Sequence, residues 1–283
     1  MRFSFDQLGQ TCGVMSGMPS SPVSASEWAV SVPAAVADLA AGAPLTPVWL
    51  NELGGITFQL GDGPARRFVK WSPPAGIALG AEVARLRWAA KFVRVPAVLE
   101  VGSDSEGSWF LTAGIPGDNA VSEHWRADPA SAVAAIGAGL RELHDTAPVR
   151  QCPFDWSVQD RLADIDRRSA VLDPAGWHDE HRPLGVERAL AIVSDPPPVD
   201  RRVVCHGDAC APNTLLSADG RYAGRVDLGS LGVADRWADL AVATWSTQWN
   251  YGSGWERPLL DAYGIEPDQE RTAYYRLLWE LGP

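Results

Sequence analysis

The stretch RRVVCHGDACAPNTLLSADGRYAGRVDLGS, residues 201–230, decides the fold of this chain and most of its chemistry. Its apolar start leads into a loop that carries His206, Asp208 and Asn213. The letters "TLL" then read as a strand, "SADG" as a turn and "RYAGRVDLG" as a returning strand. We expect this hairpin to bring Asp227, at the end of the second strand, back beside Asp208 and Asn213.

Asp208, Asn213 and Asp227 are the set of side chains that phosphoryl transfer to a hydroxyl uses. One carboxylate faces the attacking hydroxyl, while an amide and a second carboxylate face Mg²⁺, so that the protein mainly positions groups and neutralises charge. Asn213 follows Asp208 by five residues and Asp227 follows Asn213 by fourteen, a spacing that suits the catalytic loop of protein kinases. The alternative is that all three are turn-forming residues, because Asp and Asn hydrogen-bond their own backbone in loops.

The same loop also raises the possibility of a zinc site. Cys205, His206, Asp208 and Cys210 are all residue types that bind zinc. Cys205 ends an apolar strand and should face the core, and four ligands within six residues cannot easily form a tetrahedron. We therefore favour phosphoryl transfer over zinc binding.

Composition and charge narrow the class of protein. The chain has 283 residues, of which 46% are hydrophobic and 21% charged, as expected for a globular protein with one or two cores. Its formal charge of −11 argues against a nucleic-acid or anionic-membrane surface, which would need clustered Lys and Arg. The charge favours cationic or metal-bound partners.

Targeting signals are not evident. No run approaches the roughly 20 apolar residues of a membrane span, and the first residues contain no apolar stretch typical of a signal peptide. The four cysteines include no CxxC pair, which predicts reduced thiols. We expect a cytoplasmic monomer that has no nucleic-acid or membrane partner.

The order of predicted elements indicates an α+β fold with two lobes. Residues 28–117 read as a short helix, a hairpin, a helix at 78–92 and two more strands, which make a small β-rich N-lobe for nucleotide binding. Residues 118–283 are mostly helical, with a first helix that repeats apolar residues every three or four positions, and form the catalytic and substrate-binding C-lobe. Residues 1–27, rich in Gly, Ser and Pro, read as a flexible tail.

The motifs "HGDACAPN" and "VDLGSLGVADRWADLA" resemble the aminoglycoside phosphotransferase family, specifically the 3′-phosphotransferases, which have a bilobal protein-kinase-like fold. The resemblance covers about residues 45–281, because "RRFVKW", "AEVARLRW", "SWFLTAGIPG", "LRELHDTAPVRQCPFD" and "AYYRLLWEL" also match segments of the family.

The resemblance implies a role for each matching residue. Asp208 would be the catalytic aspartate that orients and deprotonates the attacking hydroxyl, and Asn213 and Asp227 would bind Mg²⁺. Lys70 would contact the α- and β-phosphates of ATP or GTP, and Glu82 would pair with Lys70. By themselves, Lys70 and Glu82 could also be ordinary solvated charges. His206 would brace the loop through hydrogen bonds.

The remaining nucleotide contacts are expected from backbone groups. The segment "ELGGITF" lacks a full GxGxxG pattern, so we expect the N–H groups of Gly55, Ile56 and Thr57 to cover the phosphates. In the hinge "TAGIP", Ala113 and Ile115 are the candidates for contact with the adenine.

The substrate end departs from the family. The resemblance implies acidic contacts to a cationic sugar, but Ser230 stands where the family has Arg, and Trp279 replaces one of two paired acids near the C-terminus. Trp279 could stack on a planar or cationic group or could simply pack in the core. The candidates for substrate contact are the following: Asp173, Asp179, Glu180, Ser230, Trp279 and Glu280.

The predicted activity is therefore transfer of a phosphoryl group from ATP or GTP, with Mg²⁺, to a hydroxyl of a cationic antibiotic. An aminoglycoside 3′-hydroxyl is the first candidate, and phosphorylation would confer resistance. A cationic cyclic peptide of the capreomycin or viomycin type is an alternative acceptor. A small-molecule metabolite kinase on the same fold and a non-catalytic nucleotide-binding module also stay open.

Overall fold

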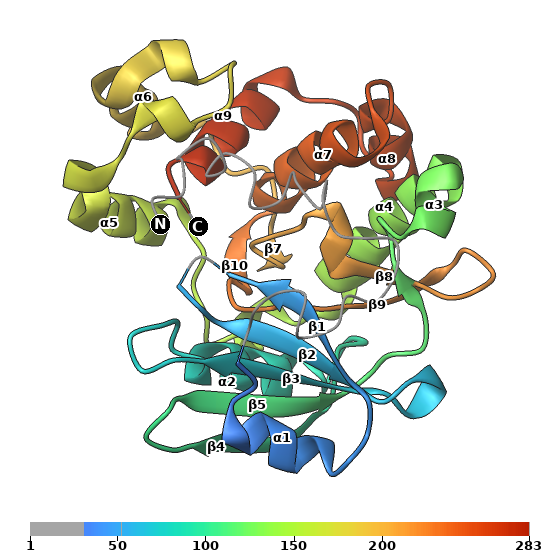
Figure 1. The fold of residues 1–283 in the computed structure, drawn as a ribbon. Helices are drawn as coiled ribbons and strands as arrows, with labels where there is room; N and C mark the ends of the chain where they lie inside the picture. Colours follow the sequence, from blue (N-terminus) through green and yellow to red (C-terminus); the bar gives the residue numbers. More distant parts are fainter. Residues whose placement is uncertain (1–30, 52, 283) are drawn as a thin grey trace. The chain divides into compact units, whose positions relative to one another are not determined.

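A computed structural model describes residues 31–51 and 53–282 (Figure 1), and the described chain falls into two compact units whose boundary in the sequence lies between Pro116 and Gly117. The predicted α+β class is confirmed. The predicted tail, residues 1–27, lies outside the described residues. The assignment of nucleotide and substrate binding to the two lobes stays a prediction.

The N-terminal unit is built on an antiparallel five-stranded sheet in the order β1-β2-β3-β5-β4. Its elements are α1 (Ala34–Ala40), β1 (Leu45–Leu50), β2 (Ile56–Leu60), the 3₁₀ turn η2 (Gly63–Ala65), β3 (Arg67–Ser72), α2 (Gly80–Ala89), β4 (Val98–Ser103) and β5 (Ser108–Ala113). The segment that we predicted to be a two-stranded hairpin forms three strands, β1, β2 and β3, because a turn before Gly55 joins β1 to β2.

The alternating pattern of β2 explains why this sheet folds. Ile56, Phe58 and Leu60 are buried and the residues between them are less so, because successive side chains of a strand point to opposite faces. Val36 and Ala40 of α1 pack against the buried face of the sheet, and Figure 1 shows α1 beside these strands. Strand β3, which carries Lys70, is the central strand of this sheet and is held by β2 on one side and β5 on the other.

The C-terminal unit is mostly helical. Its helices are α3 (Glu123–Ala127), α4 (Pro129–Thr146), α5 (Val158–Arg168), α6 (Gly185–Val193), α7 (Trp237–Tyr251), α8 (Glu256–Tyr263) and α9 (Gln269–Glu280). Its strands are β6 (Asp118–Asn119), β7 (Arg202–Cys205), β8 (Thr214–Leu216), β9 (Tyr222–Arg225) and β10 (Gly232–Asp235), which pair as β10-β7 and β6-β8-β9. None of the helices in the described part of the chain is both long and apolar enough to cross a membrane.

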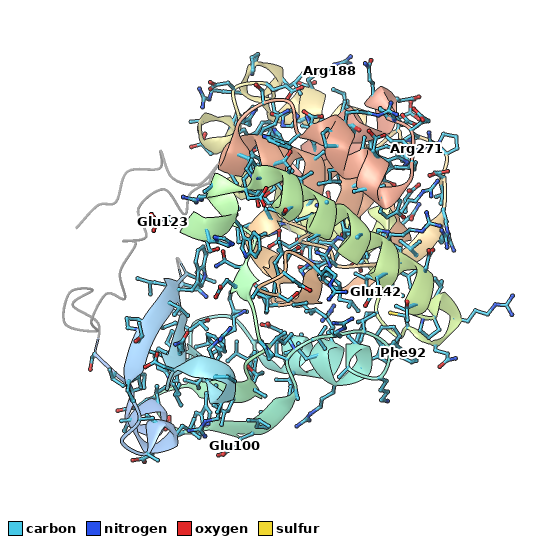
Figure 2. All side chains as sticks on the ribbon, turned by 90° about the vertical axis from the view of Figure 1, so that its right-hand side faces the viewer. Phe92, Glu100, Glu123, Glu142, Arg188 and Arg271 are labelled. Atoms are coloured by element: carbon cyan, nitrogen blue, oxygen red, sulfur yellow. The ribbon has the colours of Figure 1, made fainter. Side chains whose placement is uncertain are left out.

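Helices α4 and α7 form the centre of this unit. Every residue of α7 from Trp237 to Thr247 is buried, and α4 buries the apolar face that its spacing predicts. Figure 2, in which Glu142 labels α4, shows this helix alongside α7 and α8. Two of the buried polar side chains of α7, those of Asp239 and Ser246, accept N–H groups from the loop of residues 206–213.

The described cysteines differ in state. Cys152 and Cys205 are free thiols, whereas Cys210 is disulfide-bonded. The prediction of reduced thiols is therefore wrong for Cys210.

Candidate active site

The loop quoted first follows directly from a buried strand. Val203, Val204 and Cys205 of β7 are buried, and the chain then passes through residues 206–213 into β8. The amide nitrogen of Asn213 donates to the backbone oxygen of Asp208 and to its carboxylate Oδ2, both at 3.0 Å. The two side chains that sequence reasoning places in one site are thus in direct contact.

The β8–β9 hairpin brings the third candidate to the same place. Thr214 pairs with Arg225, and the N–H of Val226 donates to the Asn213 carbonyl at 3.1 Å. Asp227 comes next, exposed, with a positive φ of 61°. A non-glycine residue in this region of φ is uncommon and points to a site where geometry serves function.

His206 holds the loop and the hairpin together. Its Nε2–H donates to the Val226 carbonyl at 2.9 Å, and its Nδ1 accepts from the Asp208 N–H at 3.3 Å. The ring is fully buried, and burial lowers the pKa of His206 to about 4. A neutral imidazole with both nitrogens occupied braces the loop, as expected, and is not positioned to act as a base.

Asp239 of α7 is a site residue that sequence reasoning missed. Its Oδ2 accepts the His206 N–H at 2.6 Å and its Oδ1 accepts the Gly207 N–H at 2.9 Å, so one buried carboxylate fixes the backbone just before Asp208. Ser246, two turns further along α7, accepts the Ala211 N–H at 2.9 Å. The available signal was an acid inside the otherwise apolar run "WADLAVATW".

Gly207 has to be glycine. Its φ is +85°, and a Cβ built there would lie 2.2 Å from the backbone oxygen of Ser230. Only glycine allows both this conformation and this close approach. The contact also places Ser230, a predicted substrate residue, directly against the catalytic loop.

In the N-terminal unit, Lys70 and Glu82 form the predicted ion pair. The Nζ of Lys70, on β3, lies 2.8 Å from Oε2 of Glu82, on α2, and the side chains are only 19% and 10% exposed. A charge-assisted hydrogen bond of this length in a partly buried place holds the ammonium in one position. This is the arrangement expected of a lysine that contacts phosphates.

The predicted backbone contacts lie in well-defined turns of the same unit. The Gly55 N–H donates to Oδ1 of Asn51 at 2.8 Å, which closes the turn before β2, and Ile56 and Thr57 begin that strand. At the end of β5, the Ala113 N–H donates to the Ala97 carbonyl and the Ile115 carbonyl accepts from Arg66.

The substrate candidates separate into two groups. Trp279 packs with Trp249 against Cys210, two residues after Asp208, so it lies beside the catalytic loop. Glu280 instead points to the acidic insertion, where its Oε2 lies 2.9 Å from Nδ1 of the buried His181. Trp279 and His181 both lie against Trp245 of α7, with ring centroids 6.1 and 5.3 Å from that of Trp245, so positions 279 and 280 adjoin one aromatic cluster.

The acids of the insertion lie at the surface. Asp173 caps a 3₁₀ turn by accepting the Ala175 N–H, and Asp179 pairs with Arg182 at 2.7 Å while 85% exposed. Glu180 is also exposed. Exposed ion pairs are weak, so these carboxylates remain able to exchange partners.

Comparison with known proteins places the chain in a family. Residues 54–275 match the model of the phosphotransferase enzyme family. The chain is 35% identical to the aminoglycoside 3′-phosphotransferase of Streptomyces ribosidificus, over 82% of this chain and 92% of that protein. Among solved structures it is similar to an aminoglycoside 3′-phosphotransferase of type VIII, with a TM-score of 0.75 and 30% identity over 85% of this chain and 94% of that one. It is also similar to the aminoglycoside phosphotransferase APH(3″)-Id of Streptomyces rimosus in complex with ADP and streptomycin, with a TM-score of 0.63 and 28% identity over 82% and 93% of the two chains. The chain belongs to the phosphotransferase enzyme family.

Proposed function

We propose that this protein transfers the γ-phosphoryl group of ATP or GTP to a hydroxyl of a cationic antibiotic, most simply an aminoglycoside. The observation that carries the proposal is the Asp208–Asn213 contact at 3.0 Å in a loop fixed by His206 and Asp239. The relatives named as aminoglycoside phosphotransferases support the choice of acceptor. Phosphorylation would inactivate the antibiotic, and we expect the protein to act as a cytoplasmic monomer.

Asp208 is the proposed catalytic residue. Its carboxylate would accept a hydrogen bond from the acceptor hydroxyl, orient the attacking oxygen and take its proton as transfer proceeds. The Asn213 amide holds one carboxylate oxygen at 3.0 Å and so fixes the plane of the group. Positioning of this kind supplies most of the catalysis in phosphoryl transfer.

Asn213 and Asp227 fit a Mg²⁺ site. Because the Asn213 amide nitrogen is committed to Asp208, its oxygen is the atom that would face a cation, and the Asp227 carboxylate follows the paired strand. Mg²⁺ prefers such hard oxygen ligands together with water and nucleotide phosphates. When bound, the ion would neutralise charge on the phosphates.

For the nucleotide, we propose that Lys70 contacts the α- and β-phosphates while Glu82 holds it in place. The N–H groups of Ile56 and Thr57 would lie over the phosphates, and the turn at Gly55 would bring β2 to them. At the hinge, the Ala113 N–H and the Ile115 carbonyl are bonded within the unit. The proposed adenine contacts are therefore the Ala113 carbonyl and the Ile115 N–H.

The acceptor would meet an aromatic wall beside the catalytic loop. Trp279 and Trp249 pack against Cys210, and an indole face attracts a planar cation. Ser230 would contribute from its place beside Gly207. Glu280 would act indirectly by holding His181.

The exposed carboxylates of the insertion would complete the acceptor site. Asp173, Asp179 and Glu180 could exchange their solvent or Arg182 contacts for ammonium groups of the substrate. Because aromatic side chains replace part of the expected acid, a cationic cyclic peptide of the capreomycin or viomycin type is the second candidate acceptor.

The test is a screen for acceptor-dependent ADP release with ATP and GTP. The panel should contain 4,6- and 4,5-disubstituted aminoglycosides, streptomycin, a tuberactinomycin peptide and simple amino alcohols, and the position of phosphate in any product should be mapped by NMR. We expect turnover with a cationic antibiotic. Turnover with amino alcohols alone would instead favour a metabolite kinase, and nucleotide binding without any transfer would favour a non-catalytic module.

A further inference from the structure

A chain of buried polar side chains runs behind the catalytic loop through three helices. The hydroxyl of Tyr263, at the end of α8, lies 2.9 Å from Nδ1 of His144 on α4. Nε2 of the same ring lies 3.0 Å from Oδ2 of Asp239 on α7. His144 and Asp239 have fully buried side chains. Asp239 is the carboxylate that holds the backbone of His206 and Gly207.

The direction of each hydrogen bond follows from what each group can donate. The ionised Asp239 carboxylate can only accept, so Nε2 of His144 carries the ring proton and donates a hydrogen bond to Asp239. Nδ1 of the neutral ring is then the acceptor for the Tyr263 hydroxyl. Burial lowers the pKa of His144, in agreement with a neutral ring.

The same region offers three metal-ligand types, yet the geometry is that of a hydrogen-bond chain. Ligand atoms of His144, Cys205 and Asp239 lie within 4.8 Å of one another. However, both nitrogens of His144 have partners, and the Cys205 thiol donates to the Asp235 carbonyl at 3.3 Å. Burial raises the pKa of Cys205, which keeps the thiol protonated and a poor ligand.

We propose that His144 and Tyr263 are positioning residues that set the geometry of the catalytic loop through Asp239. The two backbone N–H groups hold one oxygen each of the Asp239 carboxylate, and His144 adds a third donor to Oδ2, which restrains the side chain from the side of α4. Tyr263 in turn fixes the His144 tautomer and ring orientation. Helix α8 is thereby linked to the backbone that presents Asp208, although neither residue touches the substrate.

The proposal separates the chemical step from nucleotide binding. The loop carries Asp208, whereas the Lys70–Glu82 pair belongs to the N-terminal unit. Loss of the Tyr263 hydroxyl should therefore lower kcat by about threefold to tenfold and leave the KM for nucleotide within twofold, since one neutral hydrogen bond is removed.

The experiment compares Tyr263→Phe, His144→Gln and His144→Leu with a matched control, Tyr274→Phe. Tyr274 is also a buried tyrosine of the C-terminal unit, and its hydroxyl donates to the Val193 carbonyl at 2.7 Å, away from the loop. Two readouts are needed: steady-state kinetics with a productive acceptor, and hydrogen exchange of the amides of His206 and Gly207 by NMR or by mass spectrometry of a peptide that spans them.

We expect exchange at these two amides to accelerate at least tenfold in His144→Leu and severalfold in Tyr263→Phe. His144→Gln keeps an N–H donor toward Asp239 and should restore most of the protection and of kcat. Tyr274→Phe should change neither the exchange rate of these amides nor kcat, even if it lowers Tm as much as Tyr263→Phe does.

Three results have distinct meanings. Unchanged exchange in His144→Leu, or faster exchange with unchanged kcat, would overturn the proposal. Losses of kcat that are equal in Tyr263→Phe and Tyr274→Phe would also overturn it. The kinetic arm rests on the proposed function: if the wild-type protein transfers phosphate to no acceptor, that function fails, while the exchange arm still decides whether His144 and Tyr263 hold the loop.

Discussion

Replacing Asp239 by Asn should weaken both the fold and the catalytic loop. The carboxylate accepts three N–H groups in a buried place: those of His206 at 2.6 Å, Gly207 at 2.9 Å and His144 at 3.0 Å. An amide has one oxygen, so in Asp239→Asn at least one of these donors must face an NH₂ group. The substitution changes no more than one atom and leaves no cavity.

The magnitude follows from these contacts. One hydrogen bond to a charged acceptor is lost, at about 1.5–3 kcal/mol, and a buried N–H is left without an acceptor, at about 1–3 kcal/mol. The free energy of unfolding should therefore fall by about 2.5–6 kcal/mol. Because the loop backbone is displaced next to Asp208, kcat should fall by about 10- to 100-fold.

Asp235→Asn provides the matched control. Asp235 is also buried, and its carboxylate accepts the N–H groups of Asp200 at 2.6 Å and Trp237 at 3.0 Å, but it does not contact the loop through its side chain. Burial raises the pKa of Asp235, so a neutral amide is tolerated there. For Asp239, burial alone would raise the pKa, but the hydrogen bonds from His144 and His206 lower it on balance.

The assay is urea unfolding followed by tryptophan fluorescence at several pH values, together with kcat. A folded pKa below the ordinary value of 3.8 means that the Asp239 contribution is fully present above that pH and is lost as pH falls through the folded pKa. The difference in stability between the wild type and Asp239→Asn should therefore begin to shrink as the pH falls below about 4. Equal losses of kcat in Asp239→Asn and Asp235→Asn, or a stability difference that does not shrink in acid, would refute the reasoning.

Three further outcomes are expected. Gly207→Ala should cost at least about 2 kcal/mol of stability and most of kcat, because its Cβ would lie 2.2 Å from the Ser230 oxygen at a φ of +85°; wild-type unfolding and kinetics in this variant would contradict that. Glu82→Gln should raise the KM for nucleotide by about tenfold, since Lys70 loses a charged partner at 2.8 Å, and titration of a nucleotide analogue would show an unchanged affinity if the pair is only structural. Trp279→Ala should lower kcat/KM for the acceptor by about threefold to tenfold without affecting nucleotide KM, whereas a pure packing role would change Tm alone.

The contacts of the loop of residues 206–213 were predictable because its geometry is local. A strand, a loop and a tight hairpin follow one another in sequence, so the spacing predicts that Asn213 lies beside Asp208 and that the backbone before Asp227 returns to Asn213. The helices α4 and α9 were equally accessible, since their apolar residues recur at helical spacing.

The residues that hold the site residues in place from distant parts of the sequence could not be predicted in the same way. Asp239 meets the loop across 33 residues, and Glu280 meets His181 across 99, so no local pattern records either contact. The surroundings of Trp279 and Glu280 are equally non-local: Trp279 packs beside Cys210, Glu280 pairs with His181, and both Trp279 and His181 lie against Trp245 of α7.

The most direct test of the account is phosphoryl transfer by Asp208→Asn beside the wild type, measured as ADP release and as phosphorylated antibiotic by mass spectrometry. The account predicts that kcat falls by about 100- to 10,000-fold, because the base is lost, while nucleotide binding stays within about twofold and the fold is kept. Near-normal turnover in Asp208→Asn would contradict the assignment of this loop as the catalytic centre.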